Sequence, residues 1–97
     1  MMETTTFEIS DYLDSPEVVA NYLNEVLKNG DSQDLIVALG HVSKAMGMST
    51  VAQRTGMSRT SLYKALHEDA KPQFHTVFKV LQALGSEIEI KAVQSTE

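Results

Sequence analysis

The chain has 97 residues, of which 42% are hydrophobic and 22% charged, and it contains no cysteine. This length corresponds to one small domain and excludes a large multi-step enzyme. The lack of cysteine excludes disulfides, thiolate zinc sites and cysteine nucleophiles. No run of 18 apolar residues is present to span a membrane, and the N-terminus lacks the basic and then apolar pattern of a signal peptide. We therefore expect a cytoplasmic protein with no membrane partner.

Charge divides the chain into two unlike parts, although the net value is only −5. Residues 1–40 carry eight acidic side chains and one basic one, a net charge of −7, whereas residues 41–97 carry seven bases and five acids, a net charge of +2. Within residues 43–85 six bases face two acids, which gives +4. This division indicates two macromolecular partners of different charge.

Helical spacing of apolar residues predicts five helices, over 16–28, 32–46, 49–55, 58–67 and 74–84. Asp14 or Ser15 caps the first helix, and Asp31 or Ser32 caps the second. The fifth helix is expected to place its large apolar residues on one face, namely Phe74, Val77, Phe78, Val80, Leu81 and Leu84. These elements predict an all-α fold.

The segment Ser86–Val93 changes period, because polar and apolar residues alternate along it, which predicts a short C-terminal strand. One strand cannot stand alone, so it needs either an N-terminal strand near residues 7–9 or the same strand of a second chain. We favour pairing across a homodimer through Ile88 and Ile90.

These elements divide one domain, residues 1–97, into three parts. Residues 1–15 form an acidic N-terminal arm, residues 16–85 a helical DNA-binding unit, and residues 86–97 the strand and tail. Within the helical unit, residues 49–67 fit a helix-turn-helix, because Ala52 lies four residues before Gly56, where two helices would approach closely around a tight turn.

The helix over 58–67 has two different faces when its residues are placed at 100° intervals. The inward face is expected to hold Ser61, Leu62, Ala65 and Leu66. The outward face holds Arg59, Thr60, Tyr63, Lys64 and His67, with no carboxylate. Such a face can enter the major groove of DNA.

The stretch 47–85 resembles the Xre/Cro-type repressor domain, and the whole chain resembles the HigA-like addiction-module antidote proteins. The matching residues are Asp11-Tyr12-Leu13, Tyr22-Leu23, Leu39-Gly40, Ser61-Leu62-Tyr63-Lys64-Ala65-Leu66, Thr76-Val77 and Lys79-Val80-Leu81. This resemblance covers nearly all of residues 7–93. It implies an antitoxin that neutralises a small basic RelE/HigB-like toxin, an mRNA endonuclease, and that represses its own operon as a dimer.

The same resemblance implies roles for single residues. Arg59, Thr60 and Lys64 match base-reading positions, with Arg59 reading a guanine, and Ser49, Arg54, Ser58 and Tyr63 match phosphate-contacting positions. The acidic half is the expected toxin contact, because an RNA-cutting toxin must be basic. Its candidate residues are Phe7, Ile9, Tyr12, Leu13 and Glu17.

Alternatives remain at this point. Arg54, Arg59 and Lys64 could simply be solvated, and Tyr63 could pack on a neighbouring helix. His41, His67 and His75 lack metal-ligand spacing, and no nucleophile motif is present, so we expect no enzyme, metal or cofactor. A stand-alone phage-type repressor, or an interaction module that has lost DNA binding, would also fit.

Overall fold

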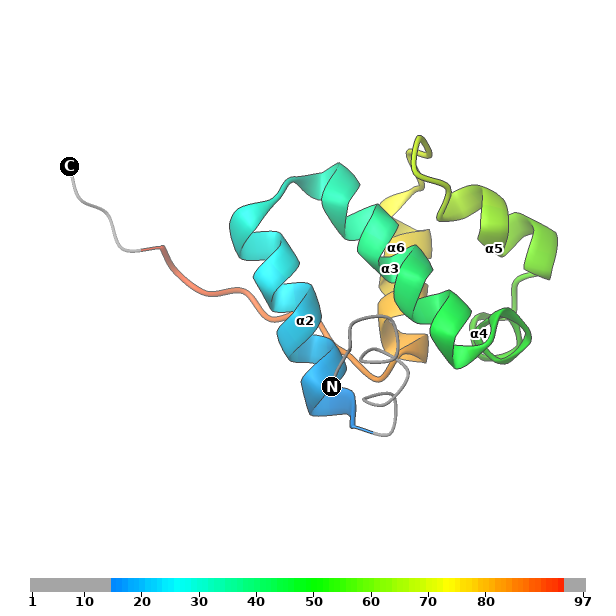
Figure 1. Cartoon of the computed structure of the whole chain (residues 1–97), viewed down its shortest axis with the longest axis horizontal. Coiled ribbons are helices and arrows are strands. Elements are labelled where there is room, and N and C mark those ends of the chain that lie inside the picture. The colour runs from blue at the N-terminus through cyan, green and yellow to red at the C-terminus, as the bar shows by residue number, and fades with distance from the viewer. Residues whose placement is uncertain (1–14, 94–97) are drawn as a thin grey trace, which may run out of the picture.

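The computed structural model describes residues 15–93 and contains five helices in that range (Figure 1). They are α2 (Pro16–Asn29), α3 (Ser32–Met46), α4 (Met48–Thr55), α5 (Arg59–Ala65) and α6 (Phe74–Ala83). The all-helical prediction is confirmed for this part of the chain, and most helix ends lie within one or two residues of the predicted ones.

Side-chain caps explain why the first two helices begin where they do. The Ser15 hydroxyl accepts a hydrogen bond from the N–H of Val18 at 3.3 Å. The carboxylate of Asp31 accepts from the N–H of Asp34 at 2.9 Å, and the Asp34 carboxylate accepts from the N–H of Asp31 at 2.9 Å. This capping box satisfies two helix-end donors at once. The sequence offered two candidate N-caps for each of these helices, and the structure shows that Ser15 caps α2 and Asp31 caps α3.

One apolar core joins the helices. α3 contacts α2, α4 and α6, and α4 also contacts α5 and α6. The largest fully buried apolar side chains come from four different helices and are Leu39, Val42, Val51, Leu62 and Val80. In Figure 1 α2 lies on one side of the molecule and α5 on the other, with α3 and α6 between them.

The apolar face predicted for α6 is only partly covered by the rest of the protein. Val80 and Ala83 are buried, but Phe74 is 69% exposed and Phe78 is 36% exposed. Because Phe74 and Phe78 are four residues apart, their side chains share a side of the helix that faces away from Val80 and Ala83. The centroids of the two rings lie 6.1 Å apart, and neither residue belongs to the core cluster.

The predicted C-terminal strand is also absent, since residues 86–93 contain neither helix nor strand in the single chain. A strand needs a hydrogen-bonded neighbour, and no partner strand lies within residues 15–93. The alternative partner near residues 7–9 falls outside the described residues. Ile88 is therefore 41% exposed and Ile90 92% exposed.

Between residues 15 and 93, no single helix is long and apolar enough to cross a membrane. α3 and α4 would pass that test only if joined across a bend of 109°.

Candidate nucleic-acid interface

A three-residue turn, Gly56-Met57-Ser58, joins α4 to α5. Gly56 has φ +77° and lies in the left-handed region, as the sequence predicted for this glycine. The N–H groups of Gly56 and Met57 both donate to the carbonyl oxygen of Ala52, at 2.9 and 3.1 Å. The two helices are therefore joined without a flexible linker.

A buried threonine reinforces this turn. The hydroxyl of Thr55 donates to the carbonyl oxygen of Ala52 at 3.1 Å and accepts from the N–H of Met57 at 3.2 Å. Thr55 is one of the few buried polar side chains in the described residues. Both its donor and its acceptor capacity are thus used to fix the angle at which α5 leaves α4.

α5 is oriented by its apolar side. Leu62 is fully buried and Leu66 is 7% exposed. The predicted base-reading residues Arg59, Thr60 and Lys64 are all exposed, and Tyr63 is 45% exposed. The structure thus brings them together on one helix face that carries no carboxylate. That face can donate hydrogen bonds to base edges and phosphates.

Ser61 differs from its predicted inward position, because it is exposed. Its N–H donates to the Ser58 hydroxyl at 3.0 Å, and that hydroxyl donates in turn to the Ser61 hydroxyl at 2.9 Å. Ser58 is therefore the N-cap of α5. Its hydroxyl is occupied within the protein, so a phosphate contact by Ser58 would use its backbone.

Ser49 lies exposed in the first turn of α4. No side chain caps this helix, and the residue before it, Gly47, has φ +114°. The N–H groups of an uncapped helix start can donate to an anion. This arrangement suits the phosphate contact predicted for Ser49.

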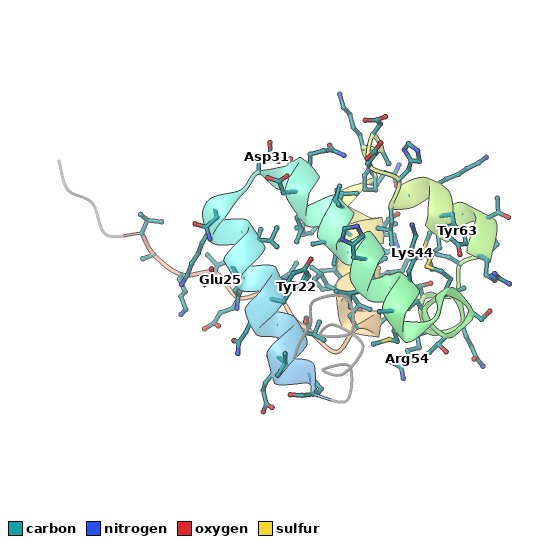
Figure 2. The ribbon with its side chains drawn as sticks, in the orientation of Figure 1. Tyr22, Glu25, Asp31, Lys44, Arg54 and Tyr63 are labelled. Carbon is teal, nitrogen blue, oxygen red and sulfur yellow. The ribbon has the colours of Figure 1, made fainter. Side chains whose placement is uncertain are left out.

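Arg54 is exposed, and its side chain also makes contacts within the protein. Its guanidinium donates to the carbonyl oxygen of Ala83 at 2.9 Å and lies 3.7 Å from the sulfur of Met46. Figure 2 shows Arg54 at the α4 end of the molecule. The side chain therefore joins α4 to the C-terminal end of α6, a packing role that the sequence did not indicate.

Sequence reasoning also missed Gln33, in the first turn of α3. Its side-chain amide donates to the carbonyl oxygen of Glu68, and to that of Ala70 at 3.1 Å. These carbonyls belong to the loop that follows α5. Gln33 is 35 and 37 positions away in sequence from these two residues. Local sequence patterns do not predict such a contact, and only the tertiary structure reveals it.

A close approach between α3 and the end of α5 explains the helical Gly40. A Cβ atom added at Gly40 would lie 3.1 Å from the carbonyl oxygen of Leu66. Beside this contact, a hollow of about 290 Å³ is lined by His41, Lys44 and Tyr63, among other residues. Figure 2 shows Lys44 and Tyr63 on the same side of the molecule. A glycine inside an otherwise regular helical pattern is the sequence signal of this close contact between α3 and the end of α5.

The acidic side chains of α2 lie on the side of the molecule away from α5, whereas the start of α3 lies beside the loop that follows α5. Glu17 and Glu25 are exposed on α2, and Asp31 and Asp34 are exposed at the start of α3. Figure 2 places Glu25 and Tyr63 on opposite sides of the molecule. Four predicted toxin contacts, Phe7, Ile9, Tyr12 and Leu13, lie outside the described residues.

Comparison with known proteins supports a family assignment. A family model described as "Probable addiction module antidote protein" matches residues 3–92. The chain belongs to this family. An uncharacterized protein of Haemophilus influenzae is similar to this antidote protein, with 38% identity over 85 residues, which is 88% of each chain. No solved structure matches the antidote protein.

The family description carries one coarse implication for this antidote protein, namely a toxin as its partner. The match to the family model extends over almost the whole chain and therefore includes both α2, with its acidic side chains, and the α4–α5 unit.

Proposed function

We propose that this antidote protein is the antitoxin of a type II toxin–antitoxin module. It binds a small basic RelE/HigB-like mRNA endonuclease directly, and it represses its own operon by sequence-specific DNA binding as a cytoplasmic homodimer. It acts by binding and not by catalysis. The observation that carries the DNA part is the exposed face of α5, which lacks carboxylates and is held in place by the buried Leu62.

In this proposal the α4–α5 unit is a helix-turn-helix, with α5 in the major groove. Arg59, in the first turn of α5, donates two hydrogen bonds to a guanine, while Thr60 and Lys64 contact neighbouring bases. Ser49 with the uncapped start of α4, the backbone at Ser58, and Tyr63 contact phosphates.

A mobility-shift assay on the protein's own promoter tests this part. Arg59→Ala should weaken specific binding by about 1–3 kcal/mol and relax base preference at one position. Lys28→Ala removes the same charge from α2 and should leave binding nearly unchanged. Equal affinity of the unaltered protein for its promoter and for random DNA would contradict base reading.

The toxin part of the proposal rests on charge. Glu17 and Glu25 are exposed on α2, on the side of the molecule away from α5, and Asp31 and Asp34 are exposed at the start of α3. The 14 residues before Ser15 add four further acids and the apolar residues Phe7, Ile9, Tyr12 and Leu13. A basic RNA-cutting enzyme is attracted to such a surface, and its RNA-binding groove would be masked there. The two partners would then occupy different sides of the antitoxin.

Co-expression with the product of the neighbouring gene tests this part. A chain lacking residues 1–14 still contains the segments of the five described helices, and it should lose most of its affinity for the toxin. Glu17→Lys should weaken the complex by a smaller amount, whereas Glu68→Lys makes the same change of charge at an exposed position in the loop after α5 and serves as the control. If no basic protein co-purifies with the full chain while promoter binding is intact, the protein is a stand-alone repressor.

A further inference from the structure

Residues 86–93 form an unpartnered segment with the residue pattern of a strand. They follow Gly85, whose φ of +85° ends the α6 region. Ile88 and Ile90 are 41% and 92% exposed, and within the described residues no strand pairs with this segment. Alternating residues with exposed apolar side chains and unpaired backbone groups are a template for pairing with another chain.

We propose that residues 86–93 of two copies pair as an antiparallel two-stranded ribbon whose two-fold axis passes through Ile90. The proposal rests on the homodimer of the proposed function and specifies its register. The occupant is a second copy because the segment is complementary to itself in one register, both in its apolar face and in its charges.

The alternation restricts the possible registers. In an antiparallel pair, directly opposite residues lie on the same face of the ribbon. Ile88, Ile90 and Ala92 form one face, and Glu87, Glu89, Lys91 and, at the end of the segment, Val93 lie on the other. A shift by one residue in pairing would place apolar residues opposite charged ones. The two-fold axis must therefore pass through a residue and not between two residues.

Charge then selects among the remaining registers. With the axis at Ile90, Glu89 lies opposite Lys91 of the second copy, and this pair occurs twice. With the axis at Glu89, Glu87 lies opposite Lys91 twice, but the two Glu89 carboxylates face each other at the centre. With the axis at Ile88, Glu87 and Glu89 face each other twice, and with the axis at Lys91 the two ammonium groups face each other. Of these four axes, only the one at Ile90 avoids like charges in opposition. Like charges directly opposite destabilise a sheet, and opposite charges stabilise it.

The apolar face of the ribbon follows from the same register. Ile90 lies opposite its own copy, and Ile88 lies opposite Ala92 twice, so that large and small side chains alternate. An isolated two-stranded ribbon has marginal stability in water. We therefore expect a dimer that dissociates in the micromolar range when neither DNA nor toxin is present.

A cysteine scan on the free full-length protein tests the register, and the absence of native cysteine makes each new thiol unique. Directly opposite Cα atoms lie about 4.5–5.5 Å apart, which fits a disulfide. Ile90→Cys should therefore form a covalent dimer on mild oxidation. Ile88→Cys alone and Ala92→Cys alone should not, whereas a mixture of the two should form a mixed dimer. Efficient self-linkage at residue 88 or 92 instead of 90 would overturn the register.

Charge exchange tests the same register without a covalent bond. Glu89→Lys or Lys91→Glu alone should raise the dimer dissociation constant roughly tenfold, because both ion pairs become repulsive. A mixture of the two variants should form heterodimers, and the double variant Glu89→Lys/Lys91→Glu should regain the original affinity. Glu25→Lys on α2 is the matched control and should have no effect.

A monomer at sub-millimolar concentration in sedimentation experiments would overturn the ribbon, as would a double variant as weak as the single ones. Because neither assay contains DNA or toxin, such a result would leave the proposed toxin and DNA contacts standing. Conversely, loss of toxin or promoter binding with an intact, register-specific dimer would count against the proposed function alone.

Discussion

The guanidinium of Arg54 donates a 2.9 Å hydrogen bond to the carbonyl oxygen of Ala83, the last residue of α6. The last carbonyl groups of a helix have no partner within the helix, and the C-terminal end attracts positive charge. Arg54 therefore satisfies α6 from the last turn of α4. The fold thus uses for packing a basic side chain that the sequence pattern assigned to DNA.

We predict that Arg54→Ala lowers the free energy of unfolding by about 1 kcal/mol, since one charge-assisted hydrogen bond is lost. Urea unfolding measures this change. Lys28→Ala, which removes an exposed base from the last turn of α2, should cost less. In promoter binding, an unchanged salt slope would show that Arg54 only packs, and a slope shallower by about one would show that it also meets a phosphate.

Removal of two buried hydroxyl groups should change the stability of the protein in opposite directions. The Oγ of Ser43 is fully buried and has no hydrogen-bond partner among the described residues, whereas the hydroxyl of Thr55 has two. Ser43→Ala should therefore stabilise the protein by about 1 kcal/mol, because an unsatisfied buried polar group is removed. Thr55→Val, nearly equal in shape, should destabilise it by about 1–2 kcal/mol. If thermal unfolding shows that both variants are stabilised, or that both are destabilised, this account of the two hydroxyl groups is wrong.

Most helix positions could be predicted from the sequence because they depend on local signals. The capping residues Ser15, Asp31 and Ser58 act within three residues of themselves, and Gly56 ends α4 through its own backbone angle. The face of α5 followed from periodicity, since Leu62 is buried and Arg59 exposed as expected.

The contacts that hold α5 in place could not be predicted, because each joins residues far apart in the chain. The side chain of Gln33 donates hydrogen bonds to the loop after α5. Gly40 has no side chain, which allows the carbonyl group of Leu66 to approach α3 closely. The exposure of Phe74 and Phe78 could not be predicted for a related reason. Helical spacing identifies the apolar side of a helix, but it does not show how much of that side the rest of the protein covers.

Acid should loosen the start of α3. The backbone N–H of Asp34 donates to the carboxylate of Asp31 and holds the pKa of that carboxyl below its ordinary value. Because the pKa is lower in the folded state, the stabilisation is complete above the ordinary carboxyl pKa of about 4. It is lost as the pH falls through the lower, folded value.

Amide hydrogen exchange at Asp34, followed as the pH is lowered from 6 to 2 and corrected for intrinsic rates, measures this effect. In an Asp31→Ser variant the cap remains but does not titrate, so the extra acid-induced opening at α3 should disappear. Persistence of the full effect in that variant would assign it to another group.

The loop after α5 should depend on the side-chain amide of Gln33, which donates to the carbonyl oxygens of Glu68 and Ala70. Gln33→Met keeps the length of the side chain but has no donor, so both carbonyls lose their partner. We expect a loss of about 1 kcal/mol in unfolding free energy. We also expect faster amide exchange at Ala70, whose N–H donates to the carbonyl oxygen of His67.

Gln33→Glu should be worse than Gln33→Met, because a carboxylate would face two carbonyl oxygens beside the acidic Glu68 and Asp69. Gln82→Met, at an exposed position on α6, is the matched control and should change neither stability nor loop exchange. If α5 reads DNA as proposed, Gln33→Met should also weaken promoter binding at temperatures where the protein remains folded. Its effect should exceed that of Gln82→Met, because the loop fixes the end of α5 against α3. Unchanged exchange at Ala70 would show that the two hydrogen bonds do not hold the loop.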